Sequence, residues 1–451
     1  MSFKFFNNDL AFPRILTYKL NNLLSKTRGY IWTEKDSNDN VVNSFAEGEP
    51  SVSGDTSIQP IANGLRSHAE GGDTFSVGNY SHAEGYGSIT QIGATFTWYE
   101  NANHLTGSTA SHGLKVNDIV MYEQGDTKLF RYVVEVNGTD VYINSALTSV
   151  LVTGATLYKC TGVAINNYTH SQGKNTIAIG DGSFAGGVSE NSGRIISRGT
   201  GSIAFGYTTG EVQHDIFSSG YGSVALGFLS GDTGAFSINV TGNGSIGVGT
   251  GPINITGHGC AAFGNNLTCS GNYNILSGYI NSGSNIGNSL IVGSNNNATG
   301  LTNSVVLGKY ALATDTDLKF IIGNGTSGTN KQNCFTIDAT GNTVSNGKIS
   351  AVDGFFQTSD ERKKNIISKD IDLDKAYSLI EKCSSIVYSL KTDETNKAQI
   401  GLIAQEVQEF FPEIITEDKD GFLNLDYSKL TVVILRVLKD LINRVSNLEN
   451  K

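Results

Sequence analysis

The segment Ser359-Asp-Glu-Arg-Lys-Lys364 holds a serine hydroxyl and a lysine amine at a spacing that permits acyl-transfer chemistry. A serine becomes an effective nucleophile when a neighbouring base takes its proton, and a lysine is such a base only in its neutral form. Burial or a nearby cation favours the neutral amine, and Arg362 and Lys363 are the closest cations in the sequence. By itself, however, a Ser-x4-Lys spacing is more typical of a solvated helix start with Ser359 as the N-cap.

The composition of the chain changes at the same place. Of the 54 glycines in 451 residues, only Gly401 and Gly421 follow Ser359, whereas charged residues become much denser there. Such a break indicates two parts with different folds. It makes the bond between Thr358 and Ser359 a candidate cleavage site at their junction.

The elements that must position the serine and lysine are predicted from apolar periodicity. Residues 371–383 have the pattern of an amphipathic helix and 385–390 that of a strand. Residues 401–412 indicate a glycine-led helix ended by proline, and 421–427 a hairpin strand. A final helix places apolar residues at alternating spacings of four and three, the pattern of a coiled-coil seam. These residues are Ile434, Leu438, Leu441, Val445 and Leu448.

Three motifs make residues 359–451 resemble the C-terminal intramolecular chaperone of endosialidases and phage tail spikes, a family of self-cleaving serine peptidases. The motif residues are Ser359, Asp360, Arg362 and Lys364; then Gly401, Ile403 to Val407 with Gln405 and Glu406, Pro412 and Glu413; then Asp426, Tyr427 and Leu430. One departure is Lys363, where the family usually has an apolar residue. This second lysine competes with Lys364, so the choice of Lys364 rests on the family's spacing.

The resemblance implies a single reaction. Ser359 would attack the carbonyl of Thr358, with Lys364 accepting the hydroxyl proton. The cut would release residues 359–451 in one turnover, without an external substrate. A C-terminal chaperone of this kind aligns three chains before they wind together, and its removal makes the assembled state kinetically stable.

Short repeats dominate the glycine-rich part. Ser67-His-Ala-Glu-Gly71 recurs as Ser81-His-Ala-Glu-Gly85, and a second form includes Ser202-Ile-Ala-Phe-Gly206, Ser223-Val-Ala-Leu-Gly227 and Ser304-Val-Val-Leu-Gly308. Alternating small and branched residues predict one short strand in each repeat, and the glycine permits the turn that follows. Coils of about 14 or 15 residues predict a solenoid, in which neighbouring coils bury each other's apolar face.

Over roughly residues 40–90 and 165–325 the repeats resemble the head repeats of trimeric autotransporter adhesins, which are left-handed β-rolls. The resemblance implies a mainly β, trimeric β-roll or solenoid shaft. With the other segments it suggests six parts. They are an N-terminal head at 1–39, rolls at 40–89 and 165–325, an inserted small β module at 90–164, a β neck at 326–358 and an α/β chaperone at 359–451 that ends in a coiled-coil helix.

The inserted module concentrates aromatic residues, namely Trp98, Tyr99, Tyr122, Tyr132 and Tyr142. They permit two interpretations, a glycan-binding surface or the core of a small barrel. An Asn137-Gly138 pair between alternating runs predicts a hairpin.

Three histidines, His68, His82 and His170, occupy equivalent repeat positions. They indicate either an ion held on a threefold axis or hydrogen-bonded structural histidines. Because no cluster of carboxylates and histidines with ligand spacing is evident in the sequence, we expect no metal and no cofactor.

Charge and composition exclude several classes. The net charge of −10, with no basic block, argues against nucleic acid as a partner. No run of about 20 apolar residues occurs, so we expect no membrane insertion. Five scattered cysteines without a CxxC pair argue against a disulfide framework or zinc site, and indicate synthesis in a reducing compartment.

We therefore expect a homotrimeric fibre or spike protein of a bacteriophage virion, made in the host cytoplasm. Residues 1–33 would attach to another virion protein, and the shaft or inserted module would contact a host-surface glycan or protein receptor. The alternatives are a trimeric bacterial adhesin and a capsule-degrading tail spike. The acidic residues that a depolymerase would need are few and scattered in the second roll: Asp181, Glu190, Glu211, Asp215, Asp232, Asp315 and Asp317.

Overall fold

A computed structural model describes residues 31–33, 44–47, 60–98, 102–124, 127–146, 152–190, 193–231, 234, 236–391, 395–418 and 421–450. Most of the predicted N-terminal head, including residues 1–30 of the attachment segment, lies outside these ranges, as does Tyr99. The chain divides into two compact units, residues 1–349 and 350–451, which are described separately.

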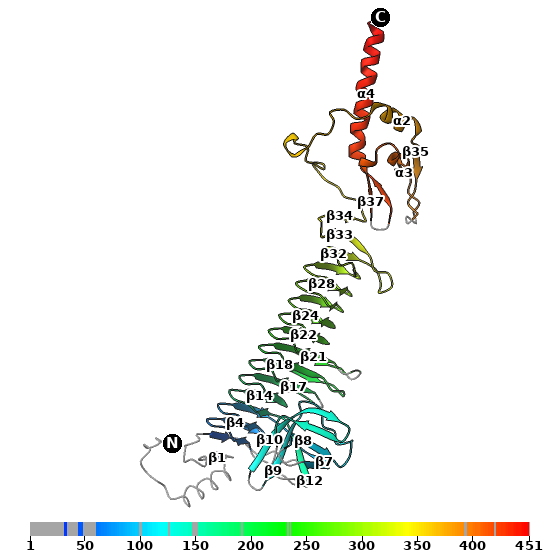
Figure 1. Ribbon diagram of the computed structural model, residues 1–451. Helices are drawn as coiled ribbons and strands as arrows, with labels where there is room; N and C mark the ends of the chain where they lie inside the picture. The colour runs from blue at the N-terminus through cyan, green and yellow to red at the C-terminus, as the bar shows by residue number, and fades with distance from the viewer. Residues whose placement is uncertain are drawn as a thin grey trace, which may run out of the picture. The chain divides into compact units, whose positions relative to one another are not determined.

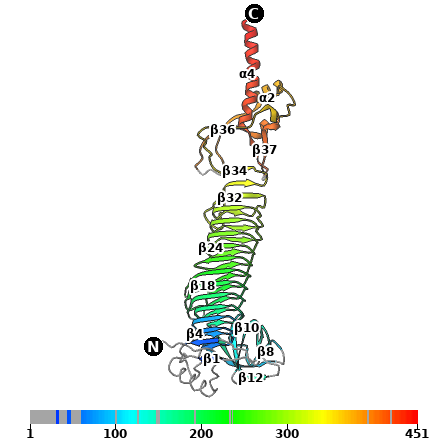
Figure 2. The ribbon, with the colours of Figure 1, turned by 90° about the vertical axis from the view of Figure 1, so that its left-hand side faces the viewer.

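Two long sheets of parallel strands form the shaft of the first unit (Figures 1 and 2). Sheet A contains β2 (Ser44–Glu47), β4 (His68–Gly72), β6 (His82–Tyr86), β14 (His170–Lys174), β16 (Phe184–Ser189), β18 (Ile203–Thr209), β20 (Val224–Ser230), β22 (Ile246–Gly249), β24 (Ala261–Asn265), β26 (Ile275–Tyr279), β28 (Leu290–Ser294), β30 (Val305–Lys309) and β32 (Leu318–Asn324). Three antiparallel strands extend it, β1 (Ile31–Thr33) beside β2, and β33 (Asn333–Asp338) and β34 (Thr343–Ser345) after β32.

Sheet B takes the alternate strands along the chain. It contains β3 (Ile61–Ala62), β5 (Phe75–Ser76), β13 (Val163–Ala164), β15 (Thr176–Ala178), β17 (Arg194–Ser197), β19 (Asp215–Ser218), β21 (Ser237–Val240), β23 (Ile253–Ile255), β25 (Leu267–Cys269), β27 (Ser282–Ser284), β29 (Asn297–Thr299) and β31 (Leu312–Ala313). Each coil thus gives one strand to each sheet, which confirms the prediction of a mainly β solenoid.

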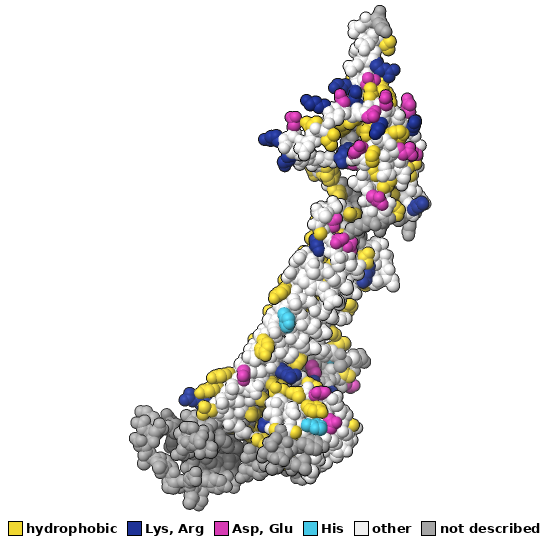
Figure 3. Space-filling model, in the orientation of Figure 1, with side chains coloured by type: hydrophobic (Ala, Val, Ile, Leu, Met, Phe, Trp, Pro, Cys, Tyr) yellow, Lys and Arg dark blue, Asp and Glu magenta, His cyan; other side chains and the backbone are white. Residues whose placement is uncertain are grey.

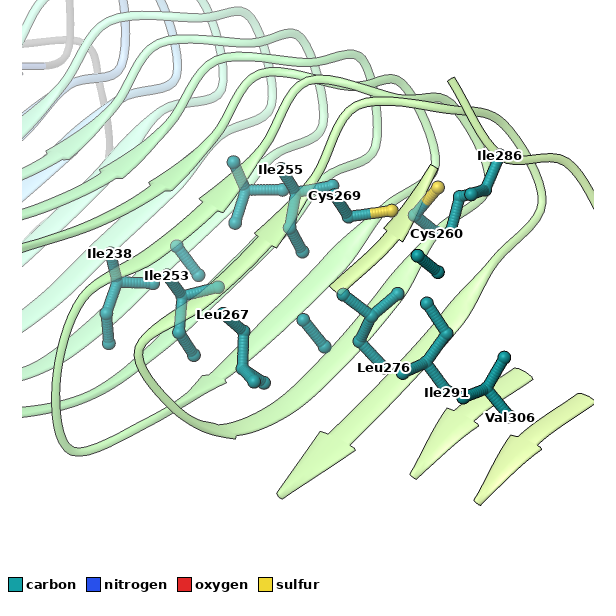
Figure 4. Close-up of a cluster of buried hydrophobic side chains, with 14 of the residues drawn as sticks. Ile238, Ile253, Ile255, Cys260, Leu267, Cys269, Leu276, Ile286, Ile291 and Val306 are labelled. Atoms are coloured by element: carbon teal, nitrogen blue, oxygen red, sulfur yellow. The ribbon is translucent and has the colours of Figure 1, made fainter. Parts of the chain in front are cut away.

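The interior of the solenoid is filled by side chains of complementary size. Sheet A presents Ala204, Ala225 and Ala262 where sheet B presents isoleucines, and all are buried. Farther along, sheet A presents Leu276, Ile291 and Val306, and sheet B changes to Gly283, Ala298 and Ala313. Figure 4 shows the labelled side chains of both sheets pointing into this core. A large residue on one sheet therefore faces a small one on the other, as close packing requires.

The terminal glycine of each repeat is needed for the close approach of neighbouring coils. Gly278 has a φ of +115°, and a Cβ built on it would lie 1.9 Å from the carbonyl oxygen of Gly293. The same overlap recurs between Gly293 and Gly308, at 1.8 Å. Any side chain at these positions would overlap the backbone of the next coil.

The first residue of each repeat is a buried hydroxyl in most coils. In three coils the hydroxyls of a sheet B serine and the repeat serine lie 2.7 Å apart: Ser76 with Ser81, Ser197 with Ser202, and Ser218 with Ser223. Buried hydroxyls need hydrogen-bond partners, and in these pairs each serine hydroxyl is the partner of the other.

A closed six-stranded barrel interrupts the repeats. Its strands are β7 (Ile89–Trp98), β8 (His104–Gly107), β9 (Ile119–Gln124), β10 (Thr127–Asn137), β11 (Asp140–Ile143) and β12 (Val152–Cys160). Asn137 pairs with Asp140, so the predicted hairpin is confirmed. Trp98 is buried in the barrel with an edge of its ring against Tyr122, and therefore belongs to the core.

The barrel covers one end of the outer face of sheet B. Its Ile119, Met121 and Phe130 form one cluster with an outward-facing column of sheet B, whose members are Phe75, Val163, Ile177, Ile196 and Phe217. Beyond the barrel the same column becomes polar, with Asn239, Asn254 and Thr268. Apart from the exposed Leu312 at the far end of this column, the described outer face of sheet B is thus apolar where the barrel covers it and polar beyond it.

Ion pairs reinforce this contact. Asp118 of the barrel has a fully buried carboxylate, which accepts from Lys159 at 2.9 Å and from Arg194 of the solenoid at 3.1 Å. Arg194 also pairs with Asp215 at 2.8 Å. Both carboxylates raise the pKa of Arg194 against the opposing effect of burial, which is the largest influence.

The second unit contains η1 (Glu361–Lys363), α2 (Leu373–Lys382), β35 (Ser385–Tyr388), β36 (Gln399–Leu402), α3 (Ala404–Gln408), η2 (Pro412–Ile414), β37 (Ile415–Glu417), β38 (Leu423–Leu425) and α4 (Tyr427–Glu449). Strands β35 and β36 pair antiparallel, as do β37 and β38. A core forms between α2, α3, η2 and α4, and its buried residues are Ala376, Leu379, Val407, Phe411, Ile414, Leu430, Val433 and Val437.

One predicted element of this unit is wrong. Gly401 does not lead a helix but lies within strand β36, paired with Ile386, and α3 is only five residues long. The reason is tertiary, because a Cβ at Gly401 would lie 2.6 Å from the hydroxyl of Tyr427. The glycine makes room for that ring.

Among the described helices, none has both the length and the apolar character required to span a membrane.

Candidate active site

A short 3₁₀ turn brings the predicted nucleophile and base together. Asp360 is the N-cap of η1, and Lys364 is its C-cap, with its backbone N–H bonded to the Glu361 carbonyl at 3.0 Å. Ser359 therefore precedes the turn and Lys364 ends it. The Lys364 Nζ donates to Ser359 Oγ at 2.8 Å, which is the distance needed for proton transfer between them.

The cap of this turn is Asp360 rather than Ser359. The Asp360 carboxylate accepts from the backbone N–H of Arg362 at 2.8 Å, so the helix-start interpretation of Ser359 is wrong. The hydroxyl of Ser359 is thereby available to Lys364.

Arg362 is occupied by the same carboxylate. Its guanidinium donates to both oxygens of Asp360, the shortest contact being 2.6 Å. This hydrogen bond lowers the pKa of Asp360 and raises the pKa of Arg362. The positive charge of Arg362 is therefore largely neutralised and favours the neutral form of Lys364 less than expected. Lys363 remains as the neighbouring cation in the sequence.

Thr358, Ser359 and Lys364 are all exposed in the single chain. A lysine can act as a base only in its neutral form, and taking its amine out of water favours that form because desolvation disfavours the charged one. The turn thus sets the distance between Ser359 and Lys364, but in the single chain it leaves the lysine amine exposed to water.

The segment before the candidate cleavage site is tied to the start of α4. Gln357 donates from its amide to the Ser428 hydroxyl at 2.9 Å. Ser428 in turn donates to Asp426, the N-cap of α4, which also accepts from the backbone N–H groups of Ser428 and Lys429. Sequence reasoning missed Gln357 and Ser428. The N-cap pattern at Asp426 was the available signal.

The remaining motif residues stabilise the unit. The Tyr427 hydroxyl accepts from the Leu402 N–H at 2.9 Å and occupies the space over Gly401. Glu406 accepts from the Ser384 N–H at 2.7 Å and so holds α3 to the end of α2. Pro412 begins η2 at a position where its missing N–H costs nothing, and Gln405 is exposed on α3.

A hollow of about 420 Å³ lies beside these motifs. It is open to solvent and lined by α2, the segment around η2, and α4. Its lining is mainly apolar, with charged groups at the rim: Ile371, Asp372, Lys375, Phe410, Phe411, Glu413, Ile414, Lys429, Val432 and Val433.

One family model matches part of the second unit. Residues 359–416 match the family described as the chaperone of endosialidase, so the resemblance is confirmed over that range. The match begins at Ser359 and ends before the third motif, at Asp426 and Tyr427.

No curated protein matches the chain. One similar solved structure is the Gp54 tailspike of Acinetobacter baumannii bacteriophage AP22 in complex with A. baumannii capsular saccharide. The similarity has a TM-score of 0.17 at 11% identity, and covers 55% of this chain and 50% of that chain.

Proposed function

We propose that this protein is a homotrimeric fibre or spike protein of a bacteriophage virion, which cuts itself once before Ser359 after its C-terminal chaperone has aligned three chains. The observation that carries the proposal is the 2.8 Å contact between Ser359 and Lys364, at the first residues of the chaperone match. The six-part division at residues 1–39, 40–89, 90–164, 165–325, 326–358 and 359–451 belongs to this proposal.

The proposed reaction uses groups already in place. Ser359 Oγ attacks the carbonyl carbon of Thr358 while Lys364 accepts the hydroxyl proton. The C–N bond then breaks, and Lys364 returns the proton to the departing amine of Ser359. Water hydrolyses the resulting ester, which leaves a carboxylate on Thr358 and a free hydroxyl on Ser359. Exposure of both side chains in the single chain supports a reaction that starts only after assembly.

Trimerisation through sheet A is supported by its uncovered outer face. Two adjacent outward columns of sheet A are mainly apolar from β16 to β32, with Ser277 as a polar member, and Phe205, Phe263 and Ile275 are 48%, 42% and 48% exposed. One column contains Phe184, Ile203, Val224, Ile246, Ala261, Ile275, Leu290, Val305 and Phe320. On sheet B, apolar columns occur only under the barrel. By the same rule, other copies of this chain would cover sheet A.

Helix α4 supports the same assembly. Leu430, Val433 and Val437 face the core of the second unit, whereas the predicted seam faces solvent. Ile434, Leu438 and Leu441 are among the exposed seam residues. A long amphipathic helix with a second, exposed apolar stripe is typical of a coiled coil between chains.

Host attachment is the proposed task of the assembled fibre. Residues 1–33 would join another virion protein, and a host-surface glycan or protein receptor would contact the shaft or the barrel. Figure 3 shows that charged side chains are sparse on the visible shaft and crowded over residues 350–451. Of the acidic residues in the second roll, Asp215 is engaged by Arg194, which does not favour a depolymerase.

The proposal is tested by expressing the full chain beside Ser359→Ala, with Ser350→Ala as the control because Ser350 is exposed and lies just upstream. We expect wild type and the control to yield two fragments on a denaturing gel, with the smaller beginning at Ser359 by mass spectrometry. Ser359→Ala should stay full length and trimeric by light scattering. A wild-type chain that is soluble, trimeric and uncut would refute the self-cleavage.

A further inference from the structure

The three repeat histidines form a column on the outer face of sheet A. Parallel pairing sets His68 opposite His82 and His82 opposite His170, while the residues that follow them, Ala69, Ala83 and Ser171, are buried inside the solenoid. The rings of His68 and His82 stack at 4.7 Å, and those of His82 and His170 lie 4.6 Å apart. The column ends against Phe184, where the apolar columns begin.

A column of carboxylates runs beside the histidines. Glu70 and Glu84 stand two residues after His68 and His82, and residues two apart on a strand share a face. The ligand atoms of His82, Glu84 and His170 all lie within 4.8 Å of one another, as do those of His68, Glu70 and His82. The first group is partly buried throughout, whereas Glu70 in the second is exposed.

The imidazole nitrogens of the first group are removed from water. Within the described part of the chain, the Nε2 atoms of His82 and His170 are buried without a hydrogen-bond partner. Burial is the main cause that lowers the pKa of both imidazoles, and for His82 the neighbouring His170 and His68 add to it. A neutral imidazole with a free nitrogen is the form that binds a metal.

We propose that His82, Glu84 and His170 bind one divalent transition-metal ion of the zinc class on each chain. Two imidazole nitrogens and one carboxylate oxygen are a set that Zn²⁺ uses, with the remaining position open to water. Bonds of about 2.0–2.1 Å place tetrahedral ligand atoms about 3.3 Å apart, so the side chains would close from their present spacing by small rotations. Gln172 donates to Glu84 at 3.4 Å and would orient the carboxylate.

The consequence is a clamp across the barrel insertion. His82 and Glu84 lie on β6, before the barrel, and His170 lies on β14, after it. The ion would fasten together two strands that are neighbours in sheet A but 88 residues apart in sequence. The sequence-based expectation of no metal overlooked these three residues, because Glu84 and His170 come from different coils.

The test uses the full, untagged chain, stripped with EDTA and titrated with Co²⁺ and then Zn²⁺. We expect one Co²⁺ per chain with the visible absorption of a tetrahedral site, displacement by Zn²⁺, and a rise in melting temperature that EDTA reverses. Two variants each introduce the residue that occupies the equivalent position in a neighbouring coil, so both should fold. Glu84→Gln copies Gln172, and His170→Phe copies Phe184.

We expect each variant to bind at least about 100-fold more weakly, since loss of an outer-shell partner alone costs about 10–100-fold. His258→Gln is the matched control, an exposed shaft histidine outside the column, and should bind as wild type does. Absence of binding by wild type, or unchanged binding by folded Glu84→Gln and His170→Phe, would overturn the proposal. One ion per three chains would overturn it as well, because the ligands would then come from several copies. None of these outcomes bears on self-cleavage.

Discussion

Replacing Lys364 by methionine removes the amine that lies 2.8 Å from Ser359 Oγ while keeping an unbranched side chain of similar length. A positioned general base contributes about 10²–10⁴-fold to a rate. At about 1.4 kcal/mol per factor of ten, its loss raises the barrier by about 3–5 kcal/mol. A chain that cuts itself in an hour should then need more than about 100 hours. Lys363→Met is the matched control and should cut much faster than Lys364→Met, because it keeps the amine that contacts Ser359.

The assay follows the fraction of uncut chain over time after expression is stopped, by denaturing gel, with the new terminus at Ser359 identified by mass. Light scattering on the same samples shows whether each variant has assembled. If Lys364→Met assembles and cuts as fast as wild type, the 2.8 Å contact has no catalytic meaning. If Lys363→Met is the slow variant instead, the base has been assigned to the wrong lysine.

Three further predictions concern assembly and stability. Gly278→Ala should destabilise the shaft by about 2–6 kcal/mol, since backbone strain and overlap with the Gly293 carbonyl each cost about 1–3 kcal/mol. Gly287→Ala, whose nearest atoms are 3.9 Å away, should barely change the stability, and equal melting temperatures by circular dichroism would contradict this reasoning. Phe205→Asp should lower the melting temperature of the trimer, whereas Asn254→Asp on sheet B should leave it unchanged; equal melting temperatures for the two variants would count against sheet A as the interface. Asp426→Ala should lose about 1 kcal/mol of unfolding free energy in urea with the α4 N-cap. The hydrogen bond from Ser428 lowers the pKa of Asp426 from 3.8 to about 2. The difference in stability between wild type and Asp426→Ala should therefore be complete above pH 4 and vanish as the pH falls towards 2. A difference independent of pH would count against the cap.

Much of the fold followed from local pattern. Alanine in Ser223-Val-Ala-Leu-Gly227 predicted an inward strand residue, and Ala225 occupies that place. The predicted turn at the glycine is wrong, because Gly227 lies within β20, where a Cβ would overlap the Gly249 carbonyl of the next coil. Helix α2 begins two residues later and ends one residue earlier than predicted, because Asp372 caps it. The mistake at Gly401 has the opposite origin. A glycine is needed at position 401 because the ring of Tyr427, 26 positions away, occupies the space beside it. No local sequence pattern reveals this contact.

The candidate site divides in the same manner. The spacing of Ser359 and Lys364 named the pair, and the family motif favoured one lysine over the other. Only the η1 turn showed that Lys364 reaches the hydroxyl and that Arg362 is held by Asp360.

The repeat, the break in composition at Ser359 and the residues of the chaperone motif can all be read from the amino-acid sequence alone. These are local properties, which depend on side-chain size, backbone freedom and spacing along the chain. Tertiary structure decided which outer columns are covered, that Gln357 is held by Ser428, and that the histidines of β6 and β14 meet beside Glu84. The physical reason is that strand pairing joins residues across an insertion of unrelated length, so their proximity has no fixed period in the sequence.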